Sequence, residues 1–362
     1  MSKKSVLILG ATGVVGYAAM QHFAGDPEAD VIAVSRRRPD ETFGARFVSV
    51  DLRDRARCAG VFGAMDGVTH LVYAALYEKE NLVAGWLDDE QIQINDEMFR
   101  NTLDPLLQSA NGLRHITLLQ GTKAYGSHVR PMAFPARENR SEARDIPNFY
   151  WKHEDYLRER QQGRNWGFTI LRPVLIIGHA LGAAMNLIPA IGAYGAILKA
   201  RGEPLYYPGG PGRVSQAIDA DMLARVIGWA GEADGARNEI FNVANGDVFS
   251  WPNVWPALAG AMDMPVGENR STSFAKEIAP LDDEWQAIVT KHQLVAPDLS
   301  RFVGLSFQYA DMQMAYGRAQ PAPVAFSSTN RLIRAGFHEV IDTEDMFVRW
   351  IRHYQDKRLL PR

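Results

Sequence analysis

The fold is decided near the N-terminus by the stretch Val6-Leu7-Ile8-Leu9-Gly10-Ala11-Thr12-Gly13-Val14-Val15-Gly16. Four apolar residues, which suit a buried strand, run directly into three glycines spaced three apart, and a helical pattern follows over Tyr17–Phe23. Glycines in such a strand–turn–helix allow a tight turn, a close approach of the backbone to a pyrophosphate, and close packing of the helix on the sheet. The first amides of the helix then face the phosphate, and the helix dipole favours its charge. We therefore expect a dinucleotide to contact Gly10, Thr12, Gly13, Val14, Val15 and Gly16, the alternative being a glycine turn that has lost its ligand.

Further short apolar runs predict a parallel sheet. Each is followed by a segment long enough for a crossover helix, and strands this apolar are covered by helices on both faces. We expect strands at Val6–Leu9, Val31–Val34, Phe47–Val50, His70–Tyr73, His115–Leu119, Thr169–Leu171 and Glu239–Val243. The predicted fold class is α/β: a doubly wound Rossmann-type sheet in residues 1–175, with pieces returning at about 213–245. A helical pattern also returns at Asp219–Gly231. We expect a smaller and mostly helical substrate-binding lobe over 176–362, with helices at Trp251–Met262, Trp285–Ala296, Asn330–Ala335 and Asp345–Tyr354.

The composition excludes several classes of protein. Of the 362 residues, 46% are hydrophobic and 22% charged, which is ordinary for a globular protein and excludes disordered and fibrous chains. The formal net charge of -3 argues against nucleic-acid binding, since proteins that bind nucleic acids carry a basic excess. The single cysteine, Cys58, excludes an intramolecular disulfide and a cysteine-rich metal site, and we expect no metal. No apolar run suits a secretory signal or a membrane span, so we expect a soluble, cytoplasmic protein. A homodimer is an expectation from the fold class alone.

The end of the second expected strand indicates which dinucleotide is bound. The strand runs into Ser35, Arg36 and Arg37, and no carboxylate follows until Asp40. Arg36 stands about where an NAD enzyme carries the acidic residue that binds the ribose 2′-hydroxyl. A guanidinium binds a 2′-phosphate through two hydrogen bonds, whereas a carboxylate would repel it, so we predict NADPH, with a solvated basic turn as the alternative. The ends of the other strands complete the expected cofactor contacts, which are Asp51 and Leu52 at the adenine edge, Ala74 and Ala75 beside the cofactor, and Gln120, Gly121, Tyr150, Pro173, Val174 and Ile176.

The catalytic residues of a typical short-chain dehydrogenase are absent from this sequence. No tyrosine is followed four residues later by lysine, and Tyr150, the tyrosine at the expected place, is followed by Glu154. A lysine does occur in the loop after the fifth strand, at Lys123. Lowering the pKa of a phenol from about 10 to near neutral pH needs roughly 4 kcal/mol. One ammonium at about 4 Å, with an effective dielectric near 20, supplies about that much. Tyr150 and Lys123 are therefore the candidates for polarising a substrate carbonyl, the alternatives being a core tyrosine and a surface lysine.

At this point the sequence resembles the progesterone 5β-reductase and iridoid synthase-like branch of the short-chain dehydrogenases. The likeness covers most of the chain, and its most specific pieces are Asn148-Phe149-Tyr150 with Glu154-Asp155, and Asn245-Gly246-Asp247-Val248-Phe249. The resemblance implies an extended short-chain dehydrogenase fold and NADPH-dependent 1,4-reduction of C=C bonds conjugated to a carbonyl, with Tyr150 and Lys123 holding the oxygen. Trp151 replaces a second tyrosine common in plant members, and the loop reads Thr-Lys-Ala-Tyr at 122–125, both as in microbial members. The segment Tyr77–Gln93 is longer and more acidic than in plant relatives, and we expect it to border the pocket.

Two further functions remain open at this stage. A carbonyl reductase or alcohol dehydrogenase would use the same residues and differ only in where the hydride is added. A non-catalytic regulator that senses NADP(H) would keep the glycine turn and lose the tyrosine, which this chain retains. A nucleotide-sugar epimerase is disfavoured because it needs the missing Tyr-x-x-x-Lys pair. We expect a small apolar carbonyl substrate, in a pocket that draws on Met185, Asn186, Leu187, Ile188, Phe307 and Tyr309.

Overall fold

The computed structural model of the chain describes residues 3–362, and these form two compact units. The first unit runs to Val174 and adds Ala220–Val243 and Ser327–His338, whereas the second comprises Leu175–Asp219, Ala244–Phe326 and Glu339–Arg362. Along the chain, the first unit is left at Val174 and re-entered at Ala220 and at Ser327. The boundary near 175 and the return at about 213–245 stay predictions, and the second return at Ser327–His338 is not among them.

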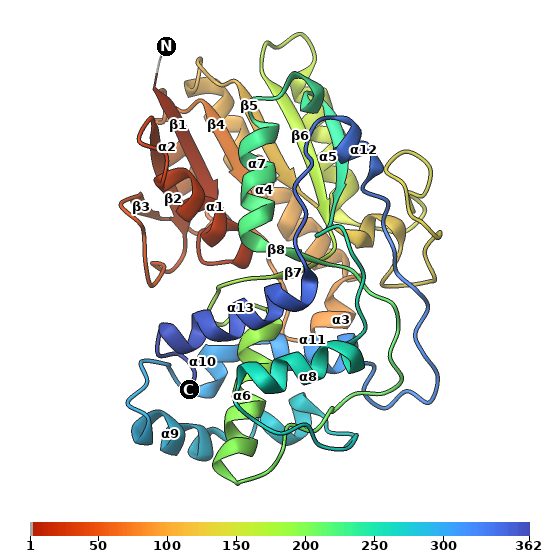
Figure 1. Cartoon of the computed structure of the whole chain (residues 1–362). Helices are drawn as coiled ribbons and strands as arrows, with labels where there is room; N and C mark the ends of the chain where they lie inside the picture. The colour runs from red at the N-terminus through yellow and green to blue at the C-terminus, as the bar shows by residue number, and fades with distance from the viewer. Residues whose placement is uncertain (1–2) are drawn as a thin grey trace. The chain divides into compact units, whose positions relative to one another are not determined.

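The first unit is built on a seven-stranded sheet in which every neighbouring pair of strands is parallel (Figure 1). The strands are β1 (Lys4–Leu9), β2 (Ala29–Ser35), β3 (Arg46–Ser49), β4 (His70–Tyr73), β5 (His115–Leu119), β6 (Gly167–Pro173) and β9 (Glu239–Val243). Their order is β3-β2-β1-β4-β5-β6-β9. The predicted doubly wound sheet is therefore confirmed, with the order reversing between β1 and β4, where ligands bind in folds of this type.

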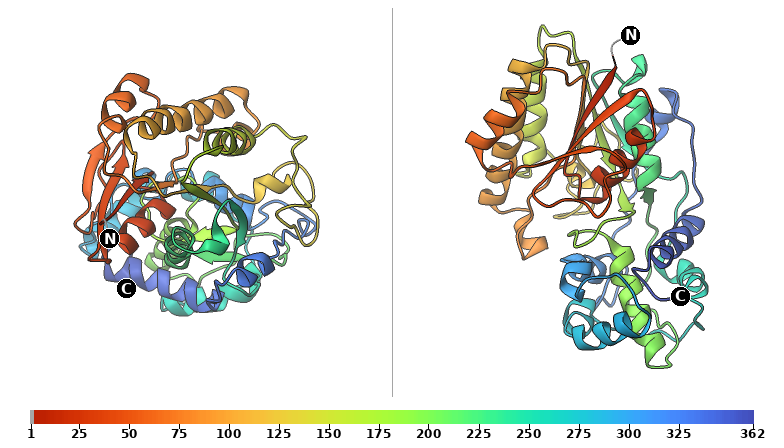
Figure 2. Two further views of the ribbon diagram at one scale, coloured as in Figure 1. Left: turned by 90° about the horizontal axis from the view of Figure 1, so that it is seen from above. Right: turned by 90° about the vertical axis from the view of Figure 1, so that its left-hand side faces the viewer.

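Helices cover both faces of this sheet, as the right-hand view of Figure 2 shows. The helices α1 (Val14–Ala24) and α7 (Ala220–Ala230) pack together on one face. On the other face α4 (Asp89–Ser109) lies between α2 (Arg55–Phe62) and α5 (Phe149–Gln161), and contacts both. The unit also contains the short helices α3 (Leu82–Gly85), η1 (Thr122–Tyr125), η2 (Asp234–Ala236) and α12 (Asn330–Arg334).

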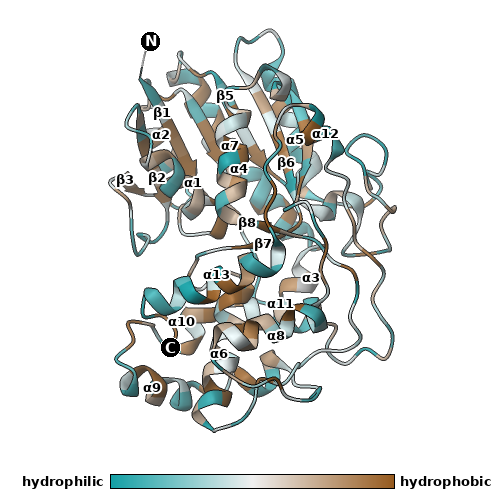
Figure 3. Ribbon diagram, viewed as in Figure 1, coloured by the Kyte–Doolittle hydropathy of each residue, from teal (hydrophilic) through white to brown (hydrophobic). Residues whose placement is uncertain are grey.

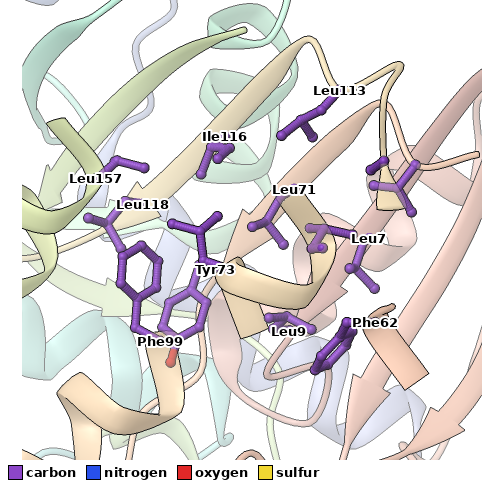
Figure 4. Close-up of a cluster of buried hydrophobic side chains, with 14 of the residues drawn as sticks. Leu7, Leu9, Phe62, Leu71, Tyr73, Phe99, Leu113, Ile116, Leu118 and Leu157 are labelled. Atoms are coloured by element: carbon purple, nitrogen blue, oxygen red, sulfur yellow. The ribbon is translucent and has the colours of Figure 1, made fainter. Parts of the chain in front are cut away.

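The core of the first unit lies between the sheet and the α2–α4–α5 layer (Figure 4). Leucines and isoleucines of β1, β4 and β5 meet aromatic side chains such as Phe62 of α2 and Phe99 of α4, both fully buried. Figure 3 shows the same pattern along the chain, with the strands hydrophobic nearly throughout. Each such leucine or phenylalanine stabilises the fold by roughly 1.5–3 kcal/mol when buried. This apolar layer fixes the strands, and hence the positions of the residues that follow them.

The second unit is mostly helical and contains one small sheet. Its strands β7 (Leu175–Ile177) and β8 (Ala217–Asp219) pair in parallel. Its helices are α6 (Leu187–Ala200), α8 (Trp251–Ala261), the π-helical turn η3 (Phe274–Ile278), α9 (Asp282–Lys291), α10 (Leu299–Val303), α11 (Ser306–Gln313) and α13 (Thr343–Asp356). Within residues 3–362, no helix combines the length and apolar character needed to cross a bilayer.

Among the elements of the second unit that differ from expectation, α6 and α9 do so for a clear physical reason. Helix α6 is buried from Leu187 to Leu198, so it lacks the polar face by which a helix is recognised in sequence. Its Pro189 stands in the first turn, where the missing amide hydrogen costs no hydrogen bond. The helix expected at Trp285–Ala296 instead begins at Asp282, because three acidic residues suit the positive end of the helix dipole. It ends at Lys291, just before Gln293 turns into the left-handed region.

Candidate active site

Residues that follow the parallel strands meet at one edge of the sheet. Leu9 of β1 lies opposite Val34 of β2 and Tyr73 of β4, and Leu119 of β5 lies opposite Leu171 of β6. This register places most of the predicted cofactor contacts of the first unit at a common edge, namely Gly10, Ser35, Ala74, Ala75, Gln120, Gly121, Pro173 and Val174. Ile176 belongs to β7 in the second unit, so its predicted contact stays a prediction.

The glycine turn has the geometry of a phosphate-binding loop. Gly10 has φ +87°, and a side-chain carbon there would lie 2.7 Å from the carbonyl oxygen of Ala74. A side-chain carbon on Gly16 would collide with the carbonyl of Gly10. The amide of Gly13 donates to that same carbonyl over 2.9 Å, and Gly13 caps α1 without a side chain that could occupy the first helical amides. These amides are positioned to bind an anion. Around them Val14 is buried, whereas Thr12 and Val15 are half-buried.

The basic residues after β2 lie on a locally ordered backbone. The buried Ser35 hydroxyl donates to the carbonyl oxygen of Arg37 over 2.5 Å, and the Ser49 hydroxyl donates to that of Arg36 over 3.0 Å. The side chains of Arg36 and Arg37 are exposed to solvent. This edge of the sheet therefore presents two guanidinium groups to any ligand bound at the end of β2.

The expected adenine-edge residues, Asp51 and Leu52, follow β3 and already have partners. The Asp51 carboxylate accepts from the Arg53 guanidinium over 2.6 Å, and this contact holds the pKa of that carboxyl below its ordinary value, with a smaller contribution from the charge of Arg36. Leu52 is buried, and its carbonyl accepts from the Asn101 amide. The backbone here is well fixed, and a role at the adenine ring stays a prediction.

Tyr150 is held at the end of β5. It is the second residue of α5, and the capping side chain of Asn148 accepts from its backbone amide over 3.0 Å. The Gln120 side chain donates to the Tyr150 carbonyl over 3.2 Å. A side-chain carbon on Gly121 would lie 3.4 Å from the Tyr150 hydroxyl and 3.6 Å from the carbonyl oxygen of Pro173. Four residues predicted separately, Gln120, Gly121, Tyr150 and Pro173, are thus brought together.

Glu154, at the position of the missing lysine, belongs to a buried ion-pair network. Its carboxylate is 3% exposed and lies 3.2 Å from the guanidinium of Arg172, a side chain with no exposed surface. Arg158 and Arg144 approach it at 3.0 Å and 3.1 Å. A lysine here would stand among three guanidinium groups. The helical position four residues after the tyrosine therefore serves the packing of α5 on β6 in this chain.

Lys123 lies in η1 and has partners that the sequence does not reveal. Its ammonium, in a side chain only 15% exposed, lies 3.7 Å from a carboxylate oxygen of Glu78 and 3.8 Å from the ring centroid of Trp86. Burial lowers the pKa of Lys123 to about 8, against the opposing effect of the Glu78 charge. Neither partner is among our predicted site residues. The available signal is the unusual segment Tyr77–Gln93, which contains both.

A histidine completes this environment. His128 is largely buried, and its ring stands at 77° to that of Trp86 with centroids 6.3 Å apart. Burial, and secondarily the charge of Lys123, lowers the pKa of His128 to about 4, so the imidazole is neutral at pH 7. Burial has the opposite effect on the carboxyl group of Glu78, whose pKa it raises, while the charge of Lys123 acts to lower that pKa. The site can thus hold a cation whose charge is sensitive to pH near neutrality.

The predicted substrate residues all lie in the second unit. Asn186 is buried, and its side-chain amide donates to the carbonyls of Gly178 and Ala180 over 3.1 Å each. Phe307 is buried against Phe274, with ring centroids 6.2 Å apart. Met185 and Tyr309 are half-buried, and burial raises the pKa of Tyr309 to about 12. Leu187 and Ile188 are buried in α6. Asn186 and Phe307 have structural contacts of their own, and substrate contact stays a prediction for the whole predicted set, which is Met185, Asn186, Leu187, Ile188, Phe307 and Tyr309.

Comparison with known proteins identifies the family. The model of the PRISE-like Rossmann-fold domain matches residues 55–350. An (S)-8-oxocitronellyl enol synthase of Catharanthus roseus is 29% identical over 99% of this chain and 93% of its own length. A 3-oxo-Delta(4,5)-steroid 5-beta-reductase of Arabidopsis thaliana is 28% identical over 98% and 92%. Among solved structures, the UDP-glucose 4-epimerase of Bifidobacterium longum in complex with NAD+ and UDP matches with a TM-score of 0.67 at 15% identity, covering 98% of this chain and 99% of the epimerase, which shows a shared fold. The chain belongs to the family of PRISE-like Rossmann-fold proteins.

Proposed function

We propose that this protein is an NADPH-dependent reductase of C=C bonds conjugated to a carbonyl, adding hydride to the β-carbon. The observation that carries the proposal is the buried cation of Lys123 in the turn after β5, together with the buried Tyr150 whose hydroxyl borders Gly121 of the same turn. The relatives support it, since a steroid 5-beta-reductase and enol synthases are among them.

The residues at the sheet edge fit a dinucleotide. Gly10, Gly13 and Gly16 leave room for the backbone to approach a pyrophosphate, and the uncapped amides at the start of α1 supply its hydrogen bonds. We propose that Arg36, aided by Arg37, binds the 2′-phosphate that distinguishes NADPH from NADH. NADPH, when bound, supplies the hydride.

Tyr150 and Lys123 would act on the substrate carbonyl. When hydride adds to the β-carbon, negative charge develops on the carbonyl oxygen, and groups already oriented towards that oxygen lower the barrier. An ammonium at about 4 Å from this charge, at an effective dielectric near 20, is worth about 4 kcal/mol. The Tyr150 hydroxyl would donate a hydrogen bond to the same oxygen. Because both groups are buried, little water competes for it.

The test is reduction of 2-cyclohexenone and of a 3-oxo-Δ4-steroid by the purified protein, with the products identified. We expect NADPH to be consumed in preference to NADH, and the products to be the saturated ketones. Tyr150→Phe and Lys123→Met should each reduce kcat strongly while NADPH binding persists. An allylic alcohol as product would instead indicate carbonyl reduction. Turnover unaffected by Tyr150→Phe would refute the assignment of the site.

A further inference from the structure

The ammonium of Lys123 lies beside a carboxylate and an indole ring, and an imidazole contacts the same indole. Glu78 approaches the ammonium at 3.7 Å, in a side chain only 6% exposed. Trp86 presents its ring face at 3.8 Å, and His128 stands beyond that ring. The titratable group that raises the pKa of Lys123 is Glu78, from the segment before α3, whereas His128, from the loop after η1, is itself affected by the charge of Lys123.

We propose that Glu78 is a positioning residue that keeps Lys123 cationic and directs its ammonium, with Trp86 enclosing the pair. The inference rests on the proposed function for its catalytic meaning, since Lys123 is the group expected to touch the substrate oxygen. Glu78 would act through Lys123. The two residues come from different parts of the chain, so the contact is made only by the fold.

The Glu78 carboxylate is itself held in place. The Gln91 side chain donates to its second oxygen over 2.8 Å and accepts from the backbone amide of Lys79 over 2.9 Å. Gln91 is 1% exposed and lies in the first turn of α4, where Asp88 caps its backbone amide. A carboxylate with one oxygen held in this way can orient a lysine, which otherwise has a flexible side chain.

The other carboxylate oxygen of Glu78, Oε1, supports a functional role for the Glu78–Lys123 pair. Among the residues that the structure describes, Glu78 Oε1, Trp86 Nε1 and both ring nitrogens of His128 are buried without a hydrogen bond of ordinary geometry, although the Trp86 indole N–H is close enough to help lower the pKa of Glu78. Buried polar groups are nearly always satisfied, so such a cluster calls for an explanation, and a catalytic role is one. Lys123 at 3.7 Å from Oε1 is an ion pair without a proper hydrogen bond, so the ammonium retains donors for a further acceptor.

Trp86 adds to this without adding charge. A cation over an indole face is attracted to it, more strongly where water is excluded. The Lys123 side chain is only 15% exposed, and this burial opposes its charge. Glu78 offsets that opposition. Removing Glu78 should therefore leave Lys123 enclosed but neutral at working pH.

The test is the pH dependence of kcat/KM for enone reduction in wild type, Glu78→Gln, Glu78→Asp and Glu80→Gln. In wild type we expect a basic limb that reports Lys123. Glu78→Gln should move this limb down by at least about one pH unit, which corresponds to about tenfold lower kcat/KM above the limb. Activity should recover at lower pH. Glu78→Asp should restore most of the wild-type profile, and Glu80→Gln, which removes an exposed carboxylate of the same segment, should match wild type.

A second variant separates charge from structure. In Glu78→Gln/Lys123→Arg the cation cannot be neutralised in this range, so the shifted limb should disappear. If Glu78 merely supported the fold, Glu78→Gln would lower kcat/KM equally at every pH, and arginine would not change the shape of the profile. Either result would overturn the proposal.

Direct titration keeps the proposal testable if the enzyme reduces no enone. The NMR signals of labelled lysine side chains, with Lys123 assigned by Lys123→Arg, report its pKa without turnover. We expect the Lys123 pKa to be lower in Glu78→Gln than in wild type. An unchanged pKa would refute the role of Glu78, whereas a lowered pKa without reductase activity would refute only the proposed function.

Discussion

Restoring the lysine of the usual Tyr-x-x-x-Lys pair should damage this protein rather than improve it. The substitution Glu154→Lys creates that pair with Tyr150, and on sequence grounds alone it would strengthen a typical short-chain dehydrogenase site. In the structure, however, the Glu154 carboxylate is buried 3.2 Å from the guanidinium of Arg172, which has no exposed surface. A lysine would replace this attraction by repulsion.

The magnitude follows from the geometry. Two unit charges 3.2 Å apart interact by about 5 kcal/mol at an effective dielectric of 20. Breaking a buried ion pair by removing one partner typically costs about 3–5 kcal/mol. Arg172 keeps Glu142 as a second partner at 2.8 Å, but the lysine adds repulsion in place of the lost attraction. Arg144 and Arg158 are each 42% exposed, so they can turn towards solvent and add little. We expect Glu154→Lys to lower the free energy of unfolding by about 3–5 kcal/mol.

Urea unfolding followed by tryptophan fluorescence measures this difference, and Asp155→Lys is the matched control. Asp155 is the next residue, 65% exposed, and pairs with Arg144 at 3.0 Å. The same change of charge there should cost less than about 1 kcal/mol. Equal stability of the two variants would refute the assigned role of Glu154. Higher reductase activity in Glu154→Lys would refute the assignment of the catalytic cation to Lys123.

Three further predictions concern the cofactor and the pH dependence. The kcat/KM of wild type should fall as the pH rises through about 8, because Lys123 loses its proton above that pKa and becomes a neutral amine. A pH profile of Lys123→Arg that lacks this fall would show that Lys123 causes it. Arg36→Gln should raise the KM for NADPH by about 10- to 150-fold, because a hydrogen bond to a charged group contributes about 1.5–3 kcal/mol. The KM for NADH should stay unchanged. Gly10→Ala should abolish binding of NADPH in fluorescence titrations, because its new carbon would meet the Ala74 carbonyl at 2.7 Å in a backbone conformation that alanine rarely adopts.

Each of these three has a contradicting result. A profile flat to pH 10 would mean that Lys123 is not needed as a cation. Equal losses for NADPH and NADH in Arg36→Gln would place that side chain away from the 2′-phosphate. Normal NADPH affinity in Gly10→Ala would show that the cofactor does not approach this turn. Gly60→Ala is a suitable control for the last, since a side-chain carbon at Gly60 has no neighbour within 4 Å.

The sheet could be predicted because its signals are local. Most strands are short apolar runs followed by a helix, although β2 leads directly into β3 and β6 into β7. In a parallel sheet such runs can be recognised without knowledge of their neighbours. The same reasoning places Gly10, Ser35 and Gln120 at strand ends, which the observed register brings to one edge. Helix α6 could not be predicted in this way because it is buried on every side, and the three-residue strands β7 and β8 are too short to show a pattern.

The partners of Lys123 could not be predicted from the sequence, for a different reason. Lys123 and Glu78 are far apart in the chain, and nothing in the composition of either segment specifies that they pair. The buried role of Glu154 was hidden in the same way, since Arg172 approaches it from β6. Sequence motifs identified the groups that carry charge. Only the packing shows which charges face one another.

On the proposed function, the catalytic cation lies in a loop rather than on a helix, and this has a chemical consequence. A lysine one turn along α5 from the tyrosine would have its position fixed by the helix alone. Lys123 instead lies in a short turn, and its charge depends on Glu78 and Trp86, both within Tyr77–Gln93. Variation in that segment can therefore change the pKa of the cation while Tyr150 and the glycine turn remain unchanged. On the proposed function, we expect exchange of Tyr77–Gln93 between relatives to shift the pH profile of enone reduction more than the affinity for NADPH. A shift in NADPH affinity alone would contradict this division of roles.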